Sequence, residues 1–453
     1  MLPESLRADL SNLETRVDES TLRSYGHDES DMGDFLPEVV VFPKNTAEVQ
    51  QIVRACVKHR VPLTPAGARS GKSGGVLPIK GGVSLSLERM NQIIAINRED
   101  LTATVQPGVI LATFQKAVEE AGLFYPPDPN SAPTCTLGGN IACNAGGPSA
   151  LKYGVTRDYV LGLEWVLPDG EVVRVGRNTI KGVAGYDLVG LFVGSEGTLG
   201  IATEITVKLI PRPPVVMTAL LPFRDVLAAA RAVNAILQGG LLPRCLELLD
   251  DVALKAIKFH EDSGAVIIAE VDGTTEEGVF ADLNLLAGIA KKHGSLDAQL
   301  AVDRDQRERI WATRRGVSPA LRAVKKYKFS EDIVVPRSKV PEAIERFKAI
   351  GRELDLPVAT YGHAGDGNLH TNVLYAGPHE RPRVDQALAR IMEVTVELGG
   401  TISGEHGIGI SKKKFLALEQ SAALISLQRR LKVHFDPHVI LNPGKIFPES
   451  EIP

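Results

Sequence analysis

Two segments of the chain carry the residue types that bind metals and move protons. Tyr361 to His370 reads Tyr-Gly-His-Ala-Gly-Asp-Gly-Asn-Leu-His, which sets two imidazoles seven residues apart across a glycine-rich turn. Ser403 to Gly409 reads Ser-Gly-Glu-His-Gly-Ile-Gly and offers a carboxylate beside an imidazole. Two histidines and one carboxylate, presented on turns, could bind zinc or a similar divalent ion and leave open positions for a substrate.

A plainer interpretation of these histidines remains open. A histidine in a glycine-rich loop is commonly solvated or bonded to the backbone. However, the chain has only ten histidines, and three of them fall in these two segments. That concentration favours one joint site, with one of the three histidines left over as a possible base.

A third segment has the composition of a phosphate-binding loop. Residues 66–75 read Ala-Gly-Ala-Arg-Ser-Gly-Lys-Ser-Gly-Gly, so several backbone N–H groups are free to hold phosphate. The segment nearly spells a nucleotide-triphosphate P-loop, but Ala66 replaces the first glycine and a strand pattern, 82–87, follows instead of a helix. A pyrophosphate loop between strands and a plain glycine-rich turn both remain open.

The elements that position these segments alternate between strand and helix patterns. Residues 39–42 predict a strand, Asn45 with Glu48 begins a helix, and 61–64 return as a strand. Leu111–Ala121 predicts a helix that Gly122 ends, and Thr203–Leu209 predicts a strand. From 368 to 374 the alternation puts His370 and Asn372 on one face of a strand.

Composition indicates a multidomain enzyme and excludes several other classes. The chain has 453 residues and a net charge of −4, with basic residues spread throughout, so no nucleic-acid or membrane surface is expected. No run reaches the roughly 18 apolar residues of a membrane span, and no secretory signal is expected. The four cysteines form no Cys-x-x-Cys pair, which favours a reducing, cytoplasmic location without an iron-sulfur cluster.

Seven ordered motifs resemble one family over nearly the whole chain. They are Thr64-Pro-Ala-Gly to Ser-Gly-Gly75, Leu137-Gly-Gly-Asn140, Gly185-Tyr-Asp-Leu188, Gly194-Ser-Glu-Gly-Thr-Leu-Gly200, His363-Ala-Gly-Asp-Gly-Asn-Leu-His370, Ser403-Gly-Glu-His-Gly407 and Leu441-Asn-Pro-Gly-Lys445. In this order they resemble the FAD-dependent D-2-hydroxyacid dehydrogenases of the vanillyl-alcohol oxidase / para-cresol methylhydroxylase (PCMH) superfamily.

The resemblance implies an α+β fold. A two-lobed PCMH-type FAD-binding domain would span residues 1–214, ending in the proline-rich linker 211–214. An α+β cap, or substrate, domain would span 215–415, with an antiparallel sheet that includes 265–271, 328–335 and 368–374 and with helices such as 341–350 on one side. Residues 416–453, including a helix at 422–435, would return to the FAD domain.

The resemblance also assigns a cofactor site for FAD. The residues expected to bind FAD are Pro65, Gly67, Ala68, Arg69, Ser70, Gly71, Lys72, Ser73, Pro107, Gly108, Pro129, Thr134, Leu137, Gly138, Gly139, Asn140, Cys143, Asn144, Gly146, Glu196, Gly197, Gly200, Ile201 and Asn442. Arg69 and Lys72 depart from the family pattern, and either could contact the pyrophosphate or point to solvent. Because no histidine lies between His59 and His260, FAD is expected to be non-covalent, with Cys135 and Cys143 as the remaining attachment points.

The same resemblance assigns roles in catalysis. His363, His370 and Glu405 would hold the divalent metal, zinc with manganese or iron as alternatives, and His406 would be the general base. Arg314 would bind the substrate carboxylate, unless it is a surface salt-bridge residue. Three further residues are matched to the substrate pocket: Ser318, Lys328 and Asn372. Lys328 could instead pair with an acid, and Ser318 stands where hydroxyglutarate enzymes have Thr.

The expected function is FAD-dependent oxidation of a D-2-hydroxy acid, of the D-lactate, glycolate or D-2-hydroxyglutarate type, to the 2-oxo acid. The electrons would pass to a quinone, an electron-transfer flavoprotein, an iron-sulfur partner subunit or oxygen. The protein would act as a homodimer or in a multi-subunit complex, in the cytoplasm or held by a partner at the inner face of the membrane. Two alternatives remain: non-redox use of the FAD scaffold, as in ether-lipid synthases, and a flavin-free metal-dependent hydrolase.

Overall fold

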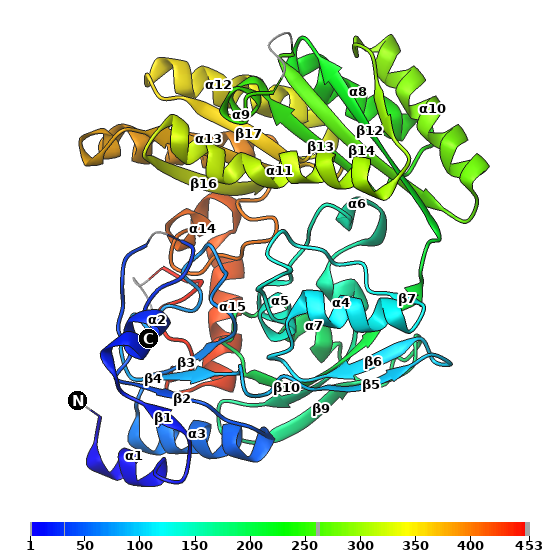
Figure 1. Ribbon diagram of the computed structural model, residues 1–453. Helices are drawn as coiled ribbons and strands as arrows, with labels where there is room; N and C mark the ends of the chain where they lie inside the picture. Colours follow the sequence, from blue (N-terminus) through cyan, green and yellow to red (C-terminus); the bar gives the residue numbers. More distant parts are fainter. Residues whose placement is uncertain (1, 31, 260–262, 449–453) are drawn as a thin grey trace.

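The computed structural model describes residues 2–30, 32–259 and 263–448. Within these residues the chain forms two smaller sheets that lie side by side and a larger, seven-stranded sheet above them (Figure 1). The predicted α+β fold is confirmed, and so is the antiparallel sheet expected in its second half. No helix in this part of the chain combines the length and apolar composition that a bilayer crossing requires.

The first lobe is built on a four-stranded sheet in the order β1-β2-β4-β3. Its strands are β1 (Thr15–Arg16), β2 (Val39–Val41), β3 (Leu63–Ala66) and β4 (Val83–Ser86), and its helices are α1 (Glu4–Asp9), α2 (Glu19–Tyr25) and α3 (Thr46–His59). The Asn45 side chain accepts the N–H of Glu48 at 3.0 Å, which caps α3 as the sequence predicted. That helix buries Val49, Ile52 and Val53 against the sheet.

The second lobe is built on an antiparallel sheet in the order β5-β6-β10-β8-β9. Its strands are β5 (Ile93–Asn97), β6 (Thr102–Val105), β8 (Val160–Val166), β9 (Val172–Gly176) and β10 (Ile201–Lys208); a small pair, β7 (Leu123–Phe124) and β11 (Ile210–Pro211), lies beside it. Its helices are α4 (Leu111–Glu120), α5 (Leu137–Cys143), α6 (Ala150–Tyr153) and α7 (Leu188–Phe192). Helix α5 forms within a segment read from sequence only as glycine-rich, because the Thr136 side chain accepts the N–H of Gly139 and caps it.

The third sheet has the order β15-β12-β14-β13-β17-β18-β16, all antiparallel. Its strands are β12 (Val215–Phe223), β13 (Cys245–Asp250), β14 (Ala265–Gly273), β15 (Gln299–Ala301), β16 (Tyr327–Val334), β17 (Val358–His363) and β18 (Asn368–Tyr375). Helices α8 (Val226–Gln238), α10 (Glu276–Lys292), α12 (Val340–Glu353) and α13 (Arg381–Glu397) pack on one face of this sheet. The opposite face carries α9 (Asp251–Ala256) and α11 (Arg304–Val324), and in Figure 1 α11 lies on the side of the two smaller sheets.

The end of the chain returns to the N-terminal lobes. After α14 (Leu416–Glu419), helix α15 (Ala422–Phe435) runs beside both lobes (Figure 1). The Lys432 ammonium donates to the carbonyls of Thr198 and Leu441, each at 2.8 Å, and Leu441 forms a parallel bridge with Leu63. These bonds join residues from three distant parts of the sequence into one unit. Residues 449–453 of the predicted C-terminal segment lie outside the described residues.

Polar contacts also hold the upper sheet against the second lobe. Lys152 forms an ion pair with Asp272 of β14, and the Tyr153 hydroxyl donates to the same carboxylate at 2.7 Å. The Arg244 guanidinium donates to the Ser149 hydroxyl at 3.0 Å. These contacts fix one end of the boundary between the two parts of the molecule.

Candidate active site

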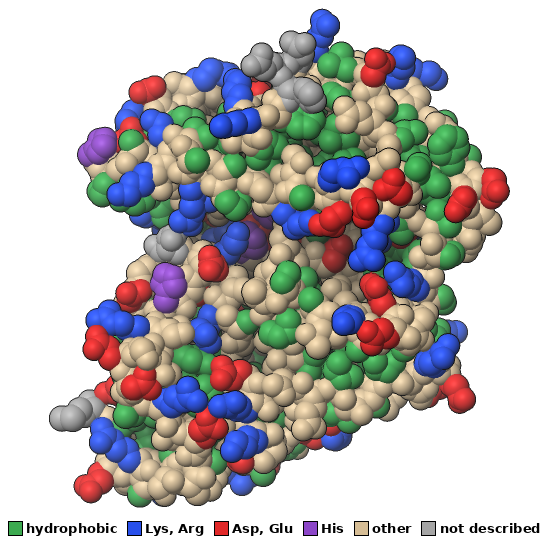
Figure 2. Space-filling view, viewed as in Figure 1, with side chains coloured by type: hydrophobic (Ala, Val, Ile, Leu, Met, Phe, Trp, Pro, Cys, Tyr) green, Lys and Arg blue, Asp and Glu red, His purple; other side chains and the backbone are tan. Residues whose placement is uncertain are grey.

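A cavity of about 480 Å³ lies at the boundary between the two lobes and the upper sheet. Its wall is made by the loop 65–73, helix α5, the turn Glu196–Gly197, and residues of α11, β17, β18 and the loop at 405–406. In the space-filling view the face is hollowed between the two parts, with Lys, Arg and His side chains visible in the hollow (Figure 2).

Most residues expected to bind FAD line this cavity. They are Pro65, Gly67, Ala68, Arg69, Ser70, Gly71, Lys72, Ser73, Pro129, Thr134, Gly138, Gly139, Asn140, Cys143, Glu196, Gly197, Gly200 and Ile201. At Gly71 no heavy atom lies within 4 Å of the place that a Cβ would take, so the backbone itself forms the wall there. The cavity therefore has the glycine-lined, backbone-rich cradle that a phosphorylated cofactor needs.

Six of the expected FAD residues do not line the cavity: Pro107, Gly108, Leu137, Asn144, Gly146 and Asn442. Pro107 accepts the N–H of Gly138 at 2.8 Å and so supports α5 from behind. The Asn442 amide donates to the carbonyls of Gly75 and Glu196, at 2.9 and 2.7 Å. These residues hold the cavity wall in place.

The two charged residues of the loop 65–73 behave differently. The Arg69 guanidinium lies 4.0 Å from the centre of the Tyr25 ring, while Lys72 is exposed at the cavity rim. Residues of the wall that the sequence did not single out include Glu29 and Trp165. No local pattern marks these two, since the fold alone brings them to the cavity.

The histidines sit on a β-hairpin. The strand pattern at 368–374 that contains His370 is confirmed, whereas the expectation that His363 is presented on a turn is wrong. His363 is the last residue of β17 and His370 lies within β18, so only residues 364–367 form the turn. In the register of the sheet, His370 is opposite Tyr361 on one side and Asp332 on the other, and His363 is opposite Glu247 of β13. Residues opposite one another share a face, so these side chains meet on the α11 side of the sheet.

Both histidines have the same arrangement of neighbours. The Nε2 atoms of His363 and His370 lie 3.5 and 3.6 Å from Oε1 of Glu405. Nδ1 of His363 is hydrogen bonded to the buried Glu247 carboxylate, and Nδ1 of His370 lies 3.9 Å from Oδ1 of Asp332. A carboxylate behind each imidazole is the usual support of a metal-binding histidine. Sequence reasoning missed both Glu247 and Asp332.

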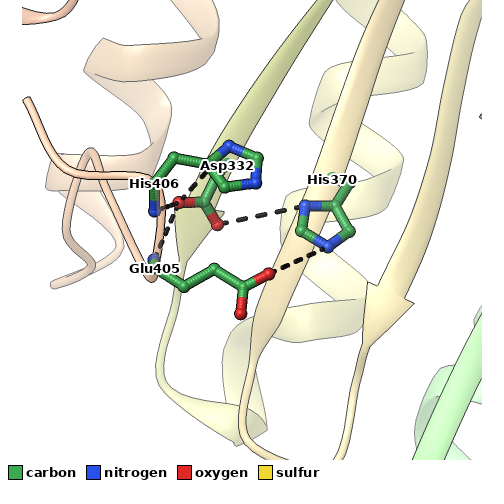
Figure 3. A group of neighbouring side chains, drawn as sticks. All are labelled: Asp332, His370, Glu405 and His406. Carbon is green, nitrogen blue, oxygen red and sulfur yellow. Dashed lines mark hydrogen bonds and ion pairs between the residues drawn. The ribbon is translucent and has the colours of Figure 1, made fainter. Parts of the chain in front are cut away.

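A wider cluster offers a second possible ligand set. Ligand atoms of Asp332, His370, Glu405 and His406 all lie within 4.8 Å of one another (Figure 3). However, Oδ2 of Asp332 already accepts three backbone N–H groups, from Gly404, Glu405 and His406, at 2.8 to 3.0 Å. Its Oδ1 accepts the Asn368 amide at 2.6 Å. Asp332 is therefore occupied as a support for the loop.

The set formed by His363, His370 and Glu405 fits a divalent ion better. The Nε2 of His363 is buried and has no hydrogen-bond partner among the described residues. Two imidazole nitrogens and one carboxylate oxygen, with open positions beside them, are a donor set suited to zinc. The three residues can therefore hold the metal that the sequence indicated.

The charges of these groups are set by burial and by one another. Burial opposes ionisation of Glu247, but His363 and Arg314 outweigh it and lower the pKa of Glu247 to about 2. Burial also opposes a charged His363, yet Glu247 raises the pKa of His363 well above its usual value. Burial, together with the His363 and His406 imidazoles, holds the pKa of His370 well below the usual value. Burial lowers the pKa of His406 as well, so its neutral imidazole can accept a proton at neutral pH.

Two of the four predicted substrate residues, Arg314 and Ser318, line the cavity. Arg314, on α11, is buried, donates from Nε to Glu247 at 2.6 Å and lies 4.8 Å from the Tyr361 ring centre. Its Nη2 is buried without a hydrogen-bond partner among the described residues. Arg314 does form an ion pair, with Glu247, but this pair lies in the interior and not at the surface. Behind it, Lys328 donates to Ser318 at 2.6 Å and to Asn372 at 3.5 Å. Ser318 lines the cavity, whereas Lys328 and Asn372 do not.

Comparison with known proteins identifies two family regions. Residues 37–176 match the description "FAD binding domain", and residues 212–446 match "FAD linked oxidases, C-terminal domain". The chain is 43% identical to glycolate oxidase subunit GlcD of Bacillus subtilis over 431 residues, which cover 93% of this chain and 92% of the relative. It is 37% identical to D-lactate dehydrogenase of Anaerostipes hadrus, covering 93% and 92%, and 35% identical to D-2-hydroxyglutarate dehydrogenase of Stutzerimonas stutzeri, covering 95% of each.

Solved structures share the fold. A structure of p-cresol methylhydroxylase superposes with a TM-score of 0.81 at 19% identity, covering 99% of this chain and 96% of the other. An alkyldihydroxyacetonephosphate synthase superposes with a TM-score of 0.78 at 20% identity, covering 98% and 86%. At these identities the likeness concerns the fold alone, whereas the family regions and the closer relatives cover nearly the whole chain. The chain therefore belongs to the FAD-linked oxidases, and it is an oxidoreductase that uses FAD.

Proposed function

We propose that this protein oxidises a D-2-hydroxy acid to the corresponding 2-oxo acid. The relatives named glycolate oxidase subunit, D-lactate dehydrogenase and D-2-hydroxyglutarate dehydrogenase support this class of substrate. The single observation that carries the proposal is the meeting, at the FAD cavity, of His370 and Glu405 with Nη2 of Arg314, which has no hydrogen-bond partner among the described residues. His363 does not line the cavity, but its Nε2 lies 3.5 Å from the same Glu405 carboxylate. That set can bind the carboxylate and the hydroxyl of one small acid.

Each residue has one task in this proposal. Arg314 binds the substrate carboxylate through its planar guanidinium, and Ser318 shapes the wall beside it. His406, with its lowered pKa, accepts the proton of the α-hydroxyl group. FAD, when bound, accepts the hydrogen from Cα with its electron pair at N5. One hydroxyl proton and one hydride leave the substrate, which becomes the 2-oxo acid.

We propose that His363, His370 and Glu405 hold a divalent metal, zinc or else manganese or iron. Such an ion, when bound, polarises the hydroxyl oxygen and orients the acid. Glu247 holds the His363 imidazole by a hydrogen bond to Nδ1, and Asp332 lies 3.9 Å from Nδ1 of His370, so a carboxylate stands behind each ring whose Nε2 is turned toward Glu405. Replacement of His363 by Ala is expected to abolish both metal content and turnover, and full metal content in that variant would refute the assignment.

We also propose that FAD is bound without a covalent link. Cys143 lines the cavity, and burial raises the pKa of its thiol to about 12; burial raises the pKa of Cys135 as well. Only the thiolate is a good nucleophile, so neither side chain is suited to attack the flavin. Precipitation of the protein with acid should release all of its flavin into the supernatant, and coloured protein in the pellet would contradict the proposal.

The domain limits and the electron acceptor belong to the same proposal. The FAD-binding domain takes residues 1–214, the cap domain 215–415 and the returning segment 416–453. The two electrons leave to an external quinone, electron-transfer flavoprotein or iron-sulfur partner. The protein works in the cytoplasm, as a homodimer or as part of a larger complex. The cysteines, all free, support a reducing compartment.

The decisive experiment is an anaerobic titration of the purified, yellow protein. D-lactate, glycolate, D-2-hydroxyglutarate and the L-enantiomers of the chiral acids are added in turn, before and after treatment with EDTA. Bleaching of the visible flavin band by a D-acid, and its loss after chelation, is the expected result. A yellow protein that no 2-hydroxy acid bleaches would refute the substrate class, and bleaching that survives chelation would refute the role of the metal.

A further inference from the structure

The loop that carries Glu405 and His406 is held between the two parts of the molecule. From the upper sheet, Asp332 accepts the N–H groups of residues 404 to 406. From the second lobe, Glu196 accepts the N–H of Ile408 at Oε1, 2.7 Å, and that of Gly409 at Oε2, 2.8 Å. Two buried carboxylates, Asp332 of β16 and Glu196 of the turn before β10, thus receive five backbone N–H groups of one short loop.

Glu196 has an unusual backbone for this task. Its φ is +52°, in the left-handed region that costs a residue with a side chain about 1 kcal/mol or more, and Gly194 and Gly197 on either side also have positive φ. The side chain is buried, and both carboxylate oxygens are used by the loop. Sequence reasoning placed Glu196 among the FAD ligands, but its carboxylate is turned toward the loop at 408–409.

The cavity loop 65–73 also contacts the segment 406–411, mainly through the backbone of Ser73. The Ser73 carbonyl accepts the N–H groups of Ile410 and Ser411 at 2.8 and 3.1 Å, and its hydroxyl donates to the His406 carbonyl at 2.9 Å. Gly409 has a φ of +50°, and a Cβ there would stand 2.1 Å from the Ser73 carbonyl oxygen. The two loops are therefore packed backbone against backbone, and a side chain at position 409 would not fit between them.

We propose that Glu196 is a positioning residue, through which the FAD domain sets the place of Glu405 and His406 over the cofactor cavity. The proposal deepens the proposed function, because it takes the roles of Glu405 and His406 from it. Asp332 fixes the N-terminal half of the loop to the sheet that carries the histidines, and Glu196 fixes the C-terminal half to the domain that carries FAD. The loop thereby fixes the position of the metal ligands relative to the flavin.

The test is amide hydrogen exchange, resolved to single residues by mass spectrometry, on the FAD-loaded protein and its Glu196→Gln variant. Glutamine has one acceptor oxygen, and its NH₂ group faces a second N–H donor, so one of the two bonds must be lost. We expect the amide that loses its acceptor, Ile408 or Gly409, to exchange about ten- to hundred-fold faster. The amides of residues 404–406, held by Asp332, should change much less, and the flavin content should stay the same.

A matched control separates positioning from general loss of stability. Glu164, in the same lobe, is also largely buried and accepts from Thr46 and Thr203, at 2.6 and 3.0 Å, far from the loop in sequence. Glu164→Gln should leave the exchange of residues 403–411 unchanged. In kinetics, Glu196→Gln should lower kcat about ten-fold or more and change KM less than three-fold, because Arg314 is untouched.

A second variant reaches the loop by a different contact. Gly409→Ala keeps Glu196 but drives a methyl group against the Ser73 carbonyl, so it should show the same local exchange increase and the same fall in kcat. Unchanged exchange at 408 and 409 in Glu196→Gln would overturn the proposal. Equally fast exchange at 408 and 409 in Glu164→Gln would also overturn it. If Glu196→Gln fails to fold, normal amide exchange and a normal kcat in Gly409→Ala would overturn the proposal instead. The exchange result requires no substrate, so it holds even if no 2-hydroxy acid bleaches the flavin.

Discussion

Glu247 gives the sharpest prediction, because one buried carboxylate supports both the metal-binding side and the substrate side of the site. It accepts Arg314 Nε at 2.6 Å and is bonded to Nδ1 of His363. Glu247→Gln keeps the size of the side chain and removes its charge. The buried Arg314 then loses its compensating charge, and His363 loses the partner that orients its ring.

The magnitude follows from the two contacts. The lowering of the Glu247 pKa from 4.5 to about 2 corresponds to roughly 3 kcal/mol of net interaction in the folded state. This is at the lower end of the roughly 3–5 kcal/mol expected when one partner of a buried ion pair is removed. Loss of a carboxylate behind a metal-binding histidine typically costs about 10- to 100-fold in metal affinity. We expect both effects, together with a raised KM because Arg314 is no longer held.

Glu270 provides the control for this experiment. It lies on the neighbouring strand β14 and is also buried. Its carboxylate accepts hydrogen bonds from Thr218 and Trp311, at 2.8 and 2.9 Å, and two arginines lie beside it. Glu270→Gln should lower the free energy of unfolding in urea without affecting metal binding measured by chelator competition. If Glu247→Gln bound metal as tightly as Glu270→Gln and kept the wild-type KM, Glu247 would not be a support of the site.

Three further predictions concern single side chains. His406→Ala should keep its FAD absorbance but reduce flavin at a rate about 10²- to 10⁴-fold lower in anaerobic stopped-flow experiments; near-normal reduction would exclude it as the base. Arg314→Met should lower kcat/KM about 10- to 100-fold with unchanged flavin content, and unaltered kinetics would remove it from the substrate pocket. Burial lowers the pKa of Lys445 to about 7, so from pH 7 to 10 the unfolded chain binds more protons than the folded one and stability rises with pH. In Lys445→Met this rise in the urea midpoint should shrink, and an unchanged slope would assign it to other groups.

Local sequence patterns predict a helix or strand well where the pattern of that one element is enough to identify it. The helix at 422–435 was predicted with the limits that α15 has, and the strand patterns at 265–271 and 368–374 lie within β14 and β18. The turn predicted between the histidines is longer than the observed one. The nearby glycines favour a turn that includes His363, whereas β17 continues to that residue. Glycine-rich composition also gave no indication of α5, which is capped by the Thr136 side chain at its start and by left-handed Asn144 at its end. Glycine permits a loop without requiring one, so its clusters overstate the length of turns.

The supports of the site needed knowledge of strand order. Glu247 lies in the largely apolar strand sequence 245–249, and a charge in such a strand implies a buried partner, because an unpaired buried charge is too costly. Asp332 carries no such signal, because β16 also contains Lys328, Ser330 and Glu331. Their partners, however, are set by the order β13-β17-β18-β16, in which Glu247 is 116 residues from His363 and Asp332 is 38 residues before His370. The same holds for Glu196, 212 residues from the loop that it holds. The groups that carry chemistry lie in short motifs and can be read locally, whereas the carboxylates that orient them are determined only when the sheets and the two domains are assembled.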